Sequence, residues 1–171
     1  MTWTTHKNDN FYHSIDTFNP IVAEEAFQNN FSVVNDVSGG QDQRMITTLR
    51  KHSAGLILTH RNKNSSSLHD KVDYKDIVKD VKNDLMKQVE NILESGVNRD
   101  QIAIDVGLGF GKTQEQSATL FESIGQFVGD YPLVVGYSRK KFTKLLKTSD
   151  EELLNHCQNQ GVSLVRLHFI D

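Results

Sequence analysis

Short apolar runs alternate along this chain with longer segments whose apolar residues recur at helical spacing. The runs predict six strands, at 12–16, 31–37, 55–60, 101–106, 133–137 and 163–168. The segments between them predict helices at 19–28, 42–53, 73–95, 113–127 and 140–160, the last interrupted near 148–150. Strict alternation of this kind is typical of parallel strands joined by helical crossovers.

The predicted helix at 73–95 carries the clearest pattern. Its apolar residues form one stripe at helical spacing, comprising Ile77, Val78, Val81, Leu85, Val89, Ile92 and Leu93. Gly96 follows as a C-cap, and Pro20 after Asn19 suits the first turn of the first helix. Because no linker, repeat or change of composition divides the chain, we expect a single domain over 1–171.

Polar residues stand at the end of nearly every apolar run. They are Asp16, Asn35 with Asp36, His60, Asp105, Ser138 just after the fifth run, and His168. Taken singly, each could be an ordinary strand end or helix cap. Because the carboxyl ends of parallel strands meet at one rim, where such folds place their sites, the repetition favours a shared site.

The glycine-rich segment 106–113 (VGLGFGKT) invites a phosphate-loop interpretation that its spacing does not support. The first glycine of that motif would have to stand at Val106, and the three glycines do not fit the dinucleotide fingerprint either. Such a turn still allows the backbone to approach a flat ligand closely. Asp105, just before it, could accept two N–H bonds from an aminopyrimidine-type ring edge.

Basic residues mark two further places. The segment 138–141 (SRKK) lies between a strand and a helix start, where it could hold an anion or be an ordinary solvated turn. Arg166 and His168 alternate on the last strand and so share one face. A charged Arg166 in an apolar strand needs a partner, either an anionic or planar ligand or an ion pair with Asp16 or Asp105.

Composition narrows the class of protein. The 171 residues are 37% hydrophobic and 24% charged, with a net charge of -3, which is ordinary for one globular domain and unlike a nucleic-acid-binding protein. With one cysteine and no long apolar stretch, we expect a cytoplasmic protein without disulfides, away from membranes. We find no His or Cys spacing of a metal site. A complete (β/α)8 barrel needs about 250 residues, so the chain is short for that fold.

Six motifs, in order, resemble bacterial dihydropteroate synthase. They are 14–17 (SIDT), 34–37 (VNDV), 58–60 (LTH), 105–112 (DVGLGFGK), 138–140 (SRK) and 165–168 (VRLH). The resemblance implies an incomplete TIM (β/α)8 barrel whose six parallel strands correspond to strands 3 to 8 of the family. It also implies condensation of p-aminobenzoate with 6-hydroxymethyl-7,8-dihydropterin diphosphate, which releases pyrophosphate in folate biosynthesis.

The resemblance assigns the pterin to five residues. Asp16, Asn35 and Asp105 would hold it, with Asp105 on its amino-pyrimidine edge. Lys140 would reach its carbonyl, and Arg166 would pack on its plane. Asp16 and Lys140 would be the catalytic pair.

The same resemblance assigns the two other parts of the reaction. Arg166 and His168 would bind the diphosphate, and Ser138 and Lys140 would border the aminobenzoate. Cationic groups on the departing diphosphate and a carboxylate near the developing pterin-methyl cation would stabilise the transition state.

Departures from the family pattern bear on the activity. Val106 replaces the proline of the usual Asp-Pro-Gly motif. The family's first two βα units, with the loop whose Asn binds Mg²⁺, and its last helix have no counterpart here. Mg²⁺ is therefore expected for the family, but its usual ligand loop is absent. An open barrel would also expose strand edges and forgo about 1.5–3 kcal/mol for each uncovered large apolar side chain.

Three functions therefore remain open at this point. The first is a dihydropteroate synthase-like transferase. The second is a non-catalytic pterin-binding or assembly module that needs a partner chain, a homodimer or another assembly covering the open strand edges. The third is a generic open α/β phosphate-binding domain.

Overall fold

A computed structural model describes residues 12–62 and 72–168, which form one parallel sheet with the strand order β1-β2-β3-β4-β5-β6. The strands are β1 (Ser14–Asp16), β2 (Val33–Asp36), β3 (Gly55–Thr59), β4 (Ile102–Asp105), β5 (Leu133–Gly136) and β6 (Leu164–Arg166). All five pairings between neighbours are parallel. Sequential strands therefore lie side by side, as in a barrel.

Helices connect the strands. They are α1 (Pro20–Gln28), α2 (Gln43–His52), α3 (Ile77–Glu94), α4 (Gln114–Glu122), α5 (Thr143–Leu146) and α6 (Asp150–Asn159), with short 3-10 turns η1 (Arg99–Gln101) and η2 (Ile124–Phe127). Side-chain caps set several starts: Asn19 accepts the Ile21 amide before α1, and Ser149 forms a capping box with Glu152 before α6. Among the described residues, no helix is long and apolar enough to cross a membrane.

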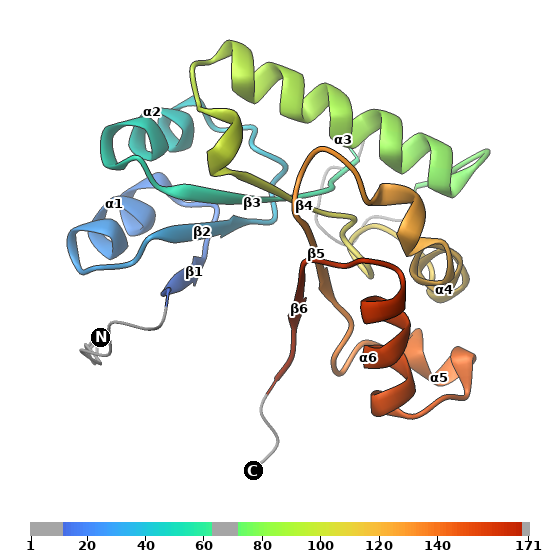
Figure 1. The fold of residues 1–171 in the computed structure, drawn as a ribbon. Helices are drawn as coiled ribbons and strands as arrows, with labels where there is room; N and C mark the ends of the chain where they lie inside the picture. Colours follow the sequence, from blue (N-terminus) through green and yellow to red (C-terminus); the bar gives the residue numbers. More distant parts are fainter. Residues whose placement is uncertain (1–11, 63–71, 169–171) are drawn as a thin grey trace.

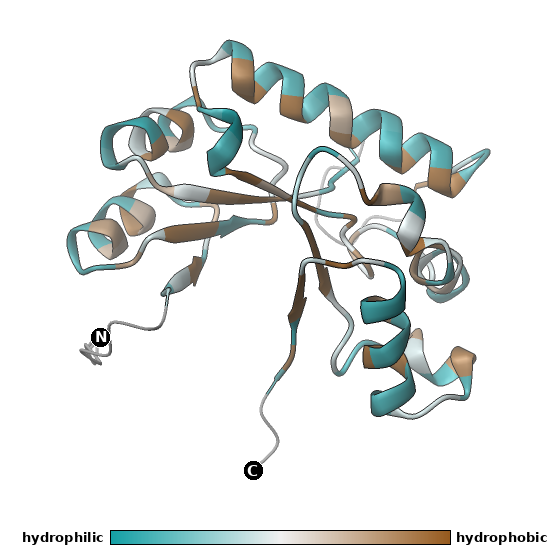
Figure 2. Ribbon diagram, in the orientation of Figure 1, coloured by the Kyte–Doolittle hydropathy of each residue, from teal (hydrophilic) through white to brown (hydrophobic). Residues whose placement is uncertain are grey.

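The sheet is curved, and all of its helices lie on the convex side (Figure 1). Strand residues that face the helices are apolar and join the buried core, among them Val34, Leu56, Ile104 and Val135. The helices turn their apolar faces toward this side of the sheet and their polar faces outward (Figure 2). The core is therefore a single layer between sheet and helices.

The concave face carries the other half of each strand. The register aligns Asp16, Asn35, Ile57 and Ala103 in one row across β1 to β4. In a closed barrel this face is the packed interior. Here Leu164 of β6 is 52% exposed, and β1 and β6 end the sheet without a further described strand beside them. The structure is a half-barrel, and the predicted incomplete TIM barrel with six parallel strands is confirmed.

Element boundaries follow the sequence predictions except near the carboxyl end. The strand expected to reach His168 ends at Arg166. The reason is that β5 pairs with β6 only as far as Gly136 with Arg166, so no ladder supports the next two residues. The helix expected from residue 140 begins at Thr143 and lasts four residues, while the predicted interruption before α6 is present.

Candidate active site

The carboxyl ends of the neighbouring strands β1 to β4 bring polar side chains together on one face of the sheet. Asn35 on β2 donates its Nδ2 to Asp16 Oδ1 on β1 at 2.8 Å. Thr59 on β3 donates its hydroxyl to Asn35 Oδ1 at 3.2 Å. Asp105 pairs in register with Thr59 and so shares this face. The sequence expectation of a common polar rim is confirmed for Asp16, Asn35 and Asp105, whereas on β3 the rim residue is Thr59 and not the expected His60.

An ion pair closes the rim across the opening of the half-barrel. Arg166 Nη1 donates to Asp16 Oδ2 at 2.5 Å, although β1 and β6 are the two edges of the sheet. The side chains of Arg166 and Asp16 are 36% and 62% exposed. Of the partners considered for Arg166 from the sequence, the structure shows Asp16. An exposed pair of this kind contributes about 0.2–1 kcal/mol, so a ligand anion can displace it.

Asp105 is the most enclosed acid of the rim. Its residue is 5% exposed, and its Oδ1 accepts the Gly107 amide at 2.7 Å. Burial raises the pKa of the Asp105 carboxyl, while the positive charges of Lys140 and Arg166 act in the opposite direction. Among the described residues no donor contacts the other carboxylate oxygen, which leaves Asp105 able to accept further N–H bonds from a bound molecule.

Lys140 reaches the same face from the turn after β5. Its Nζ donates to the Leu108 carbonyl at 2.6 Å and lies 5.1 Å from the centre of the Phe110 ring. Burial lowers the pKa of Lys140, and the Asp105 carboxylate partly offsets that effect. The segments after β4 and after β5 border a cavity of about 380 Å³, lined by Phe110, Lys140 and Phe142, among other residues. A flat ring and a cation thus border one space.

Two predicted residues lie differently from the sequence expectation. His168 follows the end of β6 and is exposed, so its expected place on the same strand face as Arg166 is wrong. Ser138 is half-buried in a turn, and α5 with its four residues is too short to offer the helix dipole that was expected for 138–141. Any anion held there would depend on the side chains.

Asp36 also turns away from the rim. Its carboxylate accepts the amides of Ser38 at 2.7 Å and Gly40 at 3.2 Å, which shapes the turn after β2. Burial raises the pKa of Asp36, partly opposed by these hydrogen bonds. This acid is a structural residue of the turn, facing the opposite side of the sheet from its neighbour Asn35.

The sequence predicted His60 on the shared rim and gave Lys112 no role beyond a phosphate loop, but the structure places them in a buried pair beneath the glycine-rich turn. Lys112 Nζ lies 3.0 Å from His60 Nδ1 and donates to the carbonyls of Gly107 and Phe110. Lys112 is 6% exposed and His60 is 0% exposed. The available signal was the lysine closing the glycine-rich segment, which was weighed only as a phosphate ligand.

The buried His60 predicts acid sensitivity. Burial, together with the charge of Lys112, lowers the pKa of His60 to about 4 from 6.5. As the pH falls below 6.5, His60 therefore binds a proton in the unfolded chain but stays neutral in the folded chain. The free energy of unfolding declines until about pH 4. We expect His60 to contribute about 1 kcal/mol per pH unit to this decline, measured by urea unfolding from pH 7 to 4.5.

The comparison for that measurement is His60→Asn, which lacks the imidazole. The difference in unfolding free energy between the two proteins isolates the histidine from acids such as Asp36 and Asp105, whose raised pKa values act in the opposite sense. A difference that stays constant with pH would contradict a neutral buried His60.

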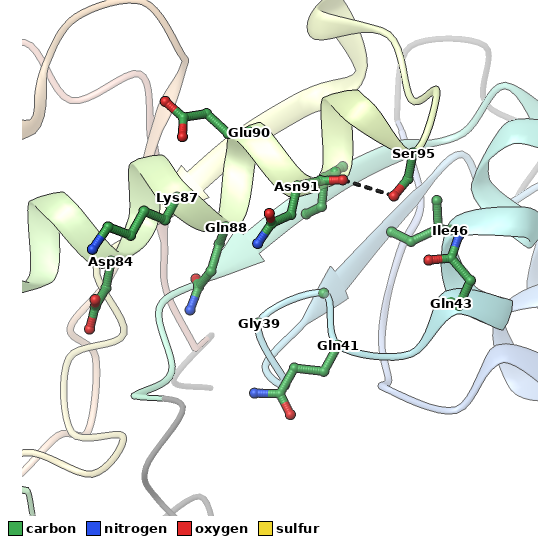
Figure 3. Close-up of a pocket in the computed structure, with 12 residues that line it drawn as sticks. Gly39, Gln41, Gln43, Ile46, Asp84, Lys87, Gln88, Glu90, Asn91 and Ser95 are labelled. Atoms are coloured by element: carbon green, nitrogen blue, oxygen red, sulfur yellow. Dashed lines mark hydrogen bonds between the residues drawn. The ribbon is translucent and has the colours of Figure 1, made fainter.

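A larger cavity, of about 600 Å³, lies elsewhere, between the turn after β2 and helix α3 (Figure 3). Its walls are amide and charged side chains such as Gln41, Gln88 and Asn91. None of the predicted site residues lines it. The predicted site residues therefore gather at the strand ends and not in this larger cavity.

The acidic, histidine and cysteine side chains are the candidate metal ligands. Within residues 12–62 and 72–168, no group of three or more His, Cys, Asp or Glu side chains could hold a metal ion. We assign no residue to a metal.

The comparisons with known proteins agree with this geometry. A model of the pterin binding enzyme family matches residues 5–168. The chain belongs to this family. The dihydropteroate synthase of Synechocystis sp. is 35% identical over 140 residues, which are 80% of this chain and 48% of that protein. That of Bacillus subtilis is 31% identical over 165 residues, 91% of this chain and 55% of that protein.

Solved structures of the family share the fold. The dihydropteroate synthase of Thermus thermophilus superimposes with a TM-score of 0.78 at 31% identity, covering 91% of this chain and 64% of that one. The same protein in complex with 6HMPPP gives a TM-score of 0.80, with 65% of that chain covered. This chain spans about half the length of the curated relatives it matches.

Proposed function

We propose that this chain binds 6-hydroxymethyl-7,8-dihydropterin diphosphate and carries the dihydropteroate synthase chemistry of folate biosynthesis. The observation that supports it most is the convergence of Asp16, Asn35, Asp105, Lys140 and Arg166 on one rim in a member of the pterin binding enzyme family. Relatives named dihydropteroate synthase, one of them solved with 6HMPPP, support the same substrate class.

The pterin would lie against the enclosed end of the rim. Asp105 offers a buried carboxylate oxygen to the amino-pyrimidine N–H groups, and Asn35 and Asp16 extend the polar row beside it. Lys140, with its nitrogen near Asp105, would donate to the pterin carbonyl. This set of donors and acceptors matches a flat ring that carries both.

The diphosphate would lie at the open end. Arg166 is already a partly exposed cation, and it leaves Asp16 when a stronger anion arrives. The exposed His168 near the same strand end adds a second group for the diphosphate. Asp16, released from its ion pair and still held by Asn35, would then face the developing pterin-methyl cation as a carboxylate.

The bond changes balance without a strong base. The bond between the pterin methylene carbon and the bridging oxygen breaks, and its electron pair leaves with pyrophosphate. The amine of p-aminobenzoate forms the new bond to that carbon and releases a proton to water. The aminobenzoate would occupy the cavity beside Phe110 and Lys140, and Ser138 directly precedes Arg139, which lines that cavity.

An alternative function is favoured by the open sheet. A pterin-binding module without turnover fits a half-barrel in which no further described strand lies beside β1 or β6 and Leu164 of β6 is 52% exposed. In either case we propose that 1–171 is one pterin-binding domain of the cytoplasm. Further polypeptide, a second copy or another chain, would complete the barrel and supply any Mg²⁺ ligands.

Turnover separates the two functions. The purified chain is incubated with Mg²⁺, pterin diphosphate and p-aminobenzoate, and dihydropteroate is quantified. Measurable turnover would eliminate the binding-only function. Calorimetry with pterin diphosphate and with inorganic pyrophosphate tests the shared proposal, because equal affinities would reduce the chain to a generic phosphate-binding domain.

The Lys140→Ala variant tests the cationic side of the site. Removing a half-buried charged donor costs about 1.5–3 kcal/mol, so we expect pterin diphosphate to bind about 10–100-fold more weakly by calorimetry. Lys144→Ala, at an exposed position of the next helix, is the matched control. Equal affinity of both variants for pterin diphosphate would show that Lys140 does not contribute to the binding site.

A further inference from the structure

The glycine-rich turn after β4 connects the two sides of the site. Its Gly107 amide donates to Asp105 Oδ1 at 2.7 Å, and its Leu108 carbonyl accepts from Lys140 Nζ at 2.6 Å. The turn is closed by the Phe110 amide, which donates to the Gly107 carbonyl at 3.1 Å. The conformation of this short segment therefore sets the positions of both Asp105 and Lys140.

Lys112 holds this turn from beneath. Its Nζ donates to the Gly107 carbonyl at 2.9 Å and to the Phe110 carbonyl at 3.1 Å, which are the two ends of the turn. The third neighbour is His60 Nδ1 at 3.0 Å. An ammonium group has three N–H donors, and the site offers three acceptors when His60 is neutral with Nδ1 unprotonated.

Filling space does not account for this lysine. An apolar side chain of similar length could fill the same volume, but it would leave the carbonyls of Gly107 and Phe110 and the Nδ1 of His60 without this donor. A buried amino group is instead costly without partners. What Lys112 adds is the set of hydrogen bonds that fixes the two carbonyls.

We propose that Lys112, which contacts His60, is a positioning residue of the pterin site. Its hydrogen bonds hold the turn from Gly107 to Phe110 in the conformation that orients Asp105 and Lys140 toward the ligand. The amino group acts through the turn, since its three neighbours are all protein atoms. The ligand named here rests on the proposed function, whereas the hold on the turn does not.

The first test needs no ligand. Lys112→Met keeps the length of the side chain and removes its donors. We expect amide hydrogen exchange at Gly107, Gly109 and Phe110 to become at least about tenfold faster, with exchange in β3 unchanged. Lys79→Met, at an exposed position of α3, is the control. Unchanged exchange in the turn would overturn the inference, as would equal acceleration throughout the protein.

The second test measures binding. Lys112→Met should weaken pterin diphosphate binding at least about tenfold and leave inorganic pyrophosphate, which needs only the Arg166 end, within about twofold. Parallel loss of both ligands would show general destabilisation and overturn the positioning role. If the unmodified chain binds no pterin diphosphate, the proposed function fails, and the exchange experiment still decides whether Lys112 holds the turn.

A second pair of variants applies if Lys112→Met does not fold. His60→Asn keeps an acceptor near the position of Nδ1, whereas His60→Leu removes it. We expect faster exchange in the turn for His60→Leu and wild-type exchange for His60→Asn. Equal exchange rates of the turn amides in the two variants would contradict a role for His60 as the hydrogen-bond acceptor for Lys112.

Discussion

Replacing Asp105 with asparagine is expected to weaken the binding of pterin diphosphate by about 100-fold. The carboxylate is buried at the end of β4 and is proposed to accept N–H groups from the amino-pyrimidine edge. An amide would place an N–H donor against one of those N–H groups and would also remove the negative charge beside Lys140. Losing one charge-assisted hydrogen bond costs about 1.5–3 kcal/mol, and a 100-fold loss of affinity corresponds to about 2.8 kcal/mol, near the top of that range.

This loss should occur without unfolding. The amide oxygen of asparagine can still accept the Gly107 amide, which Asp105 Oδ1 accepts now. Because burial raises the pKa of the carboxyl, removing the charge also relieves a cost of burying it. Asp100→Asn, on the exposed turn before β4, is the control for calorimetry and circular dichroism. An Asp105→Asn protein that binds as tightly as this control would refute the proposed pterin edge.

The fold was largely predictable because each element carries its own local signal. Alternating apolar runs and helical stripes, such as that of α3, placed all six strands and the long helices close to their observed positions. The boundaries failed where tertiary pairing decides them. The strand containing Arg166 ends when its neighbour β5 ends, and the sequence of one strand does not carry that information.

The site was predictable in its residue types and less so in its contacts. Strand order alone places Asp16, Asn35 and Asp105 on one rim, because parallel strands end at the same edge. The ion pair between Asp16 and Arg166 depends on the curvature of the whole sheet, which brings residues 150 positions apart into contact. No local pattern encodes that curvature.

Lys112 illustrates a different limit. A lysine in a glycine-rich segment has the same sequence signature whether its amino group faces a phosphate or the carbonyls of its own loop. The distinction is made by the left-handed conformation of Gly107, with φ of +67°, which folds the turn over the lysine. Backbone conformation at this one residue therefore decides the role of another five positions away.

Gly107→Ala is accordingly expected to cause the largest loss of stability among single glycine substitutions. A Cβ at this residue would lie 2.4 Å from the His60 carbonyl oxygen, a backbone atom that cannot move without displacing the end of β3. The left-handed conformation adds about 1–2 kcal/mol for a non-glycine residue. We expect a total loss of about 3 kcal/mol or more in the free energy of unfolding, measured by urea denaturation.

Substitutions at two other glycines separate the steric contribution to this loss from the conformational one. Gly109 also has a left-handed conformation, with φ of +80°, but its nearest obstacle is the Lys140 side chain at 3.8 Å, so Gly109→Ala should lose only the conformational part. Gly129 has nothing within 4 Å, and Gly129→Ala should be neutral or slightly stabilising. If Gly107→Ala lost no more stability than Gly109→Ala, the contact with the His60 carbonyl would not be what requires glycine. A loss of stability clearly beyond that of Gly109→Ala would instead show that the end of β3 can approach the turn this closely only because residue 107 has no side chain. The same close approach brings Lys112 into contact with His60.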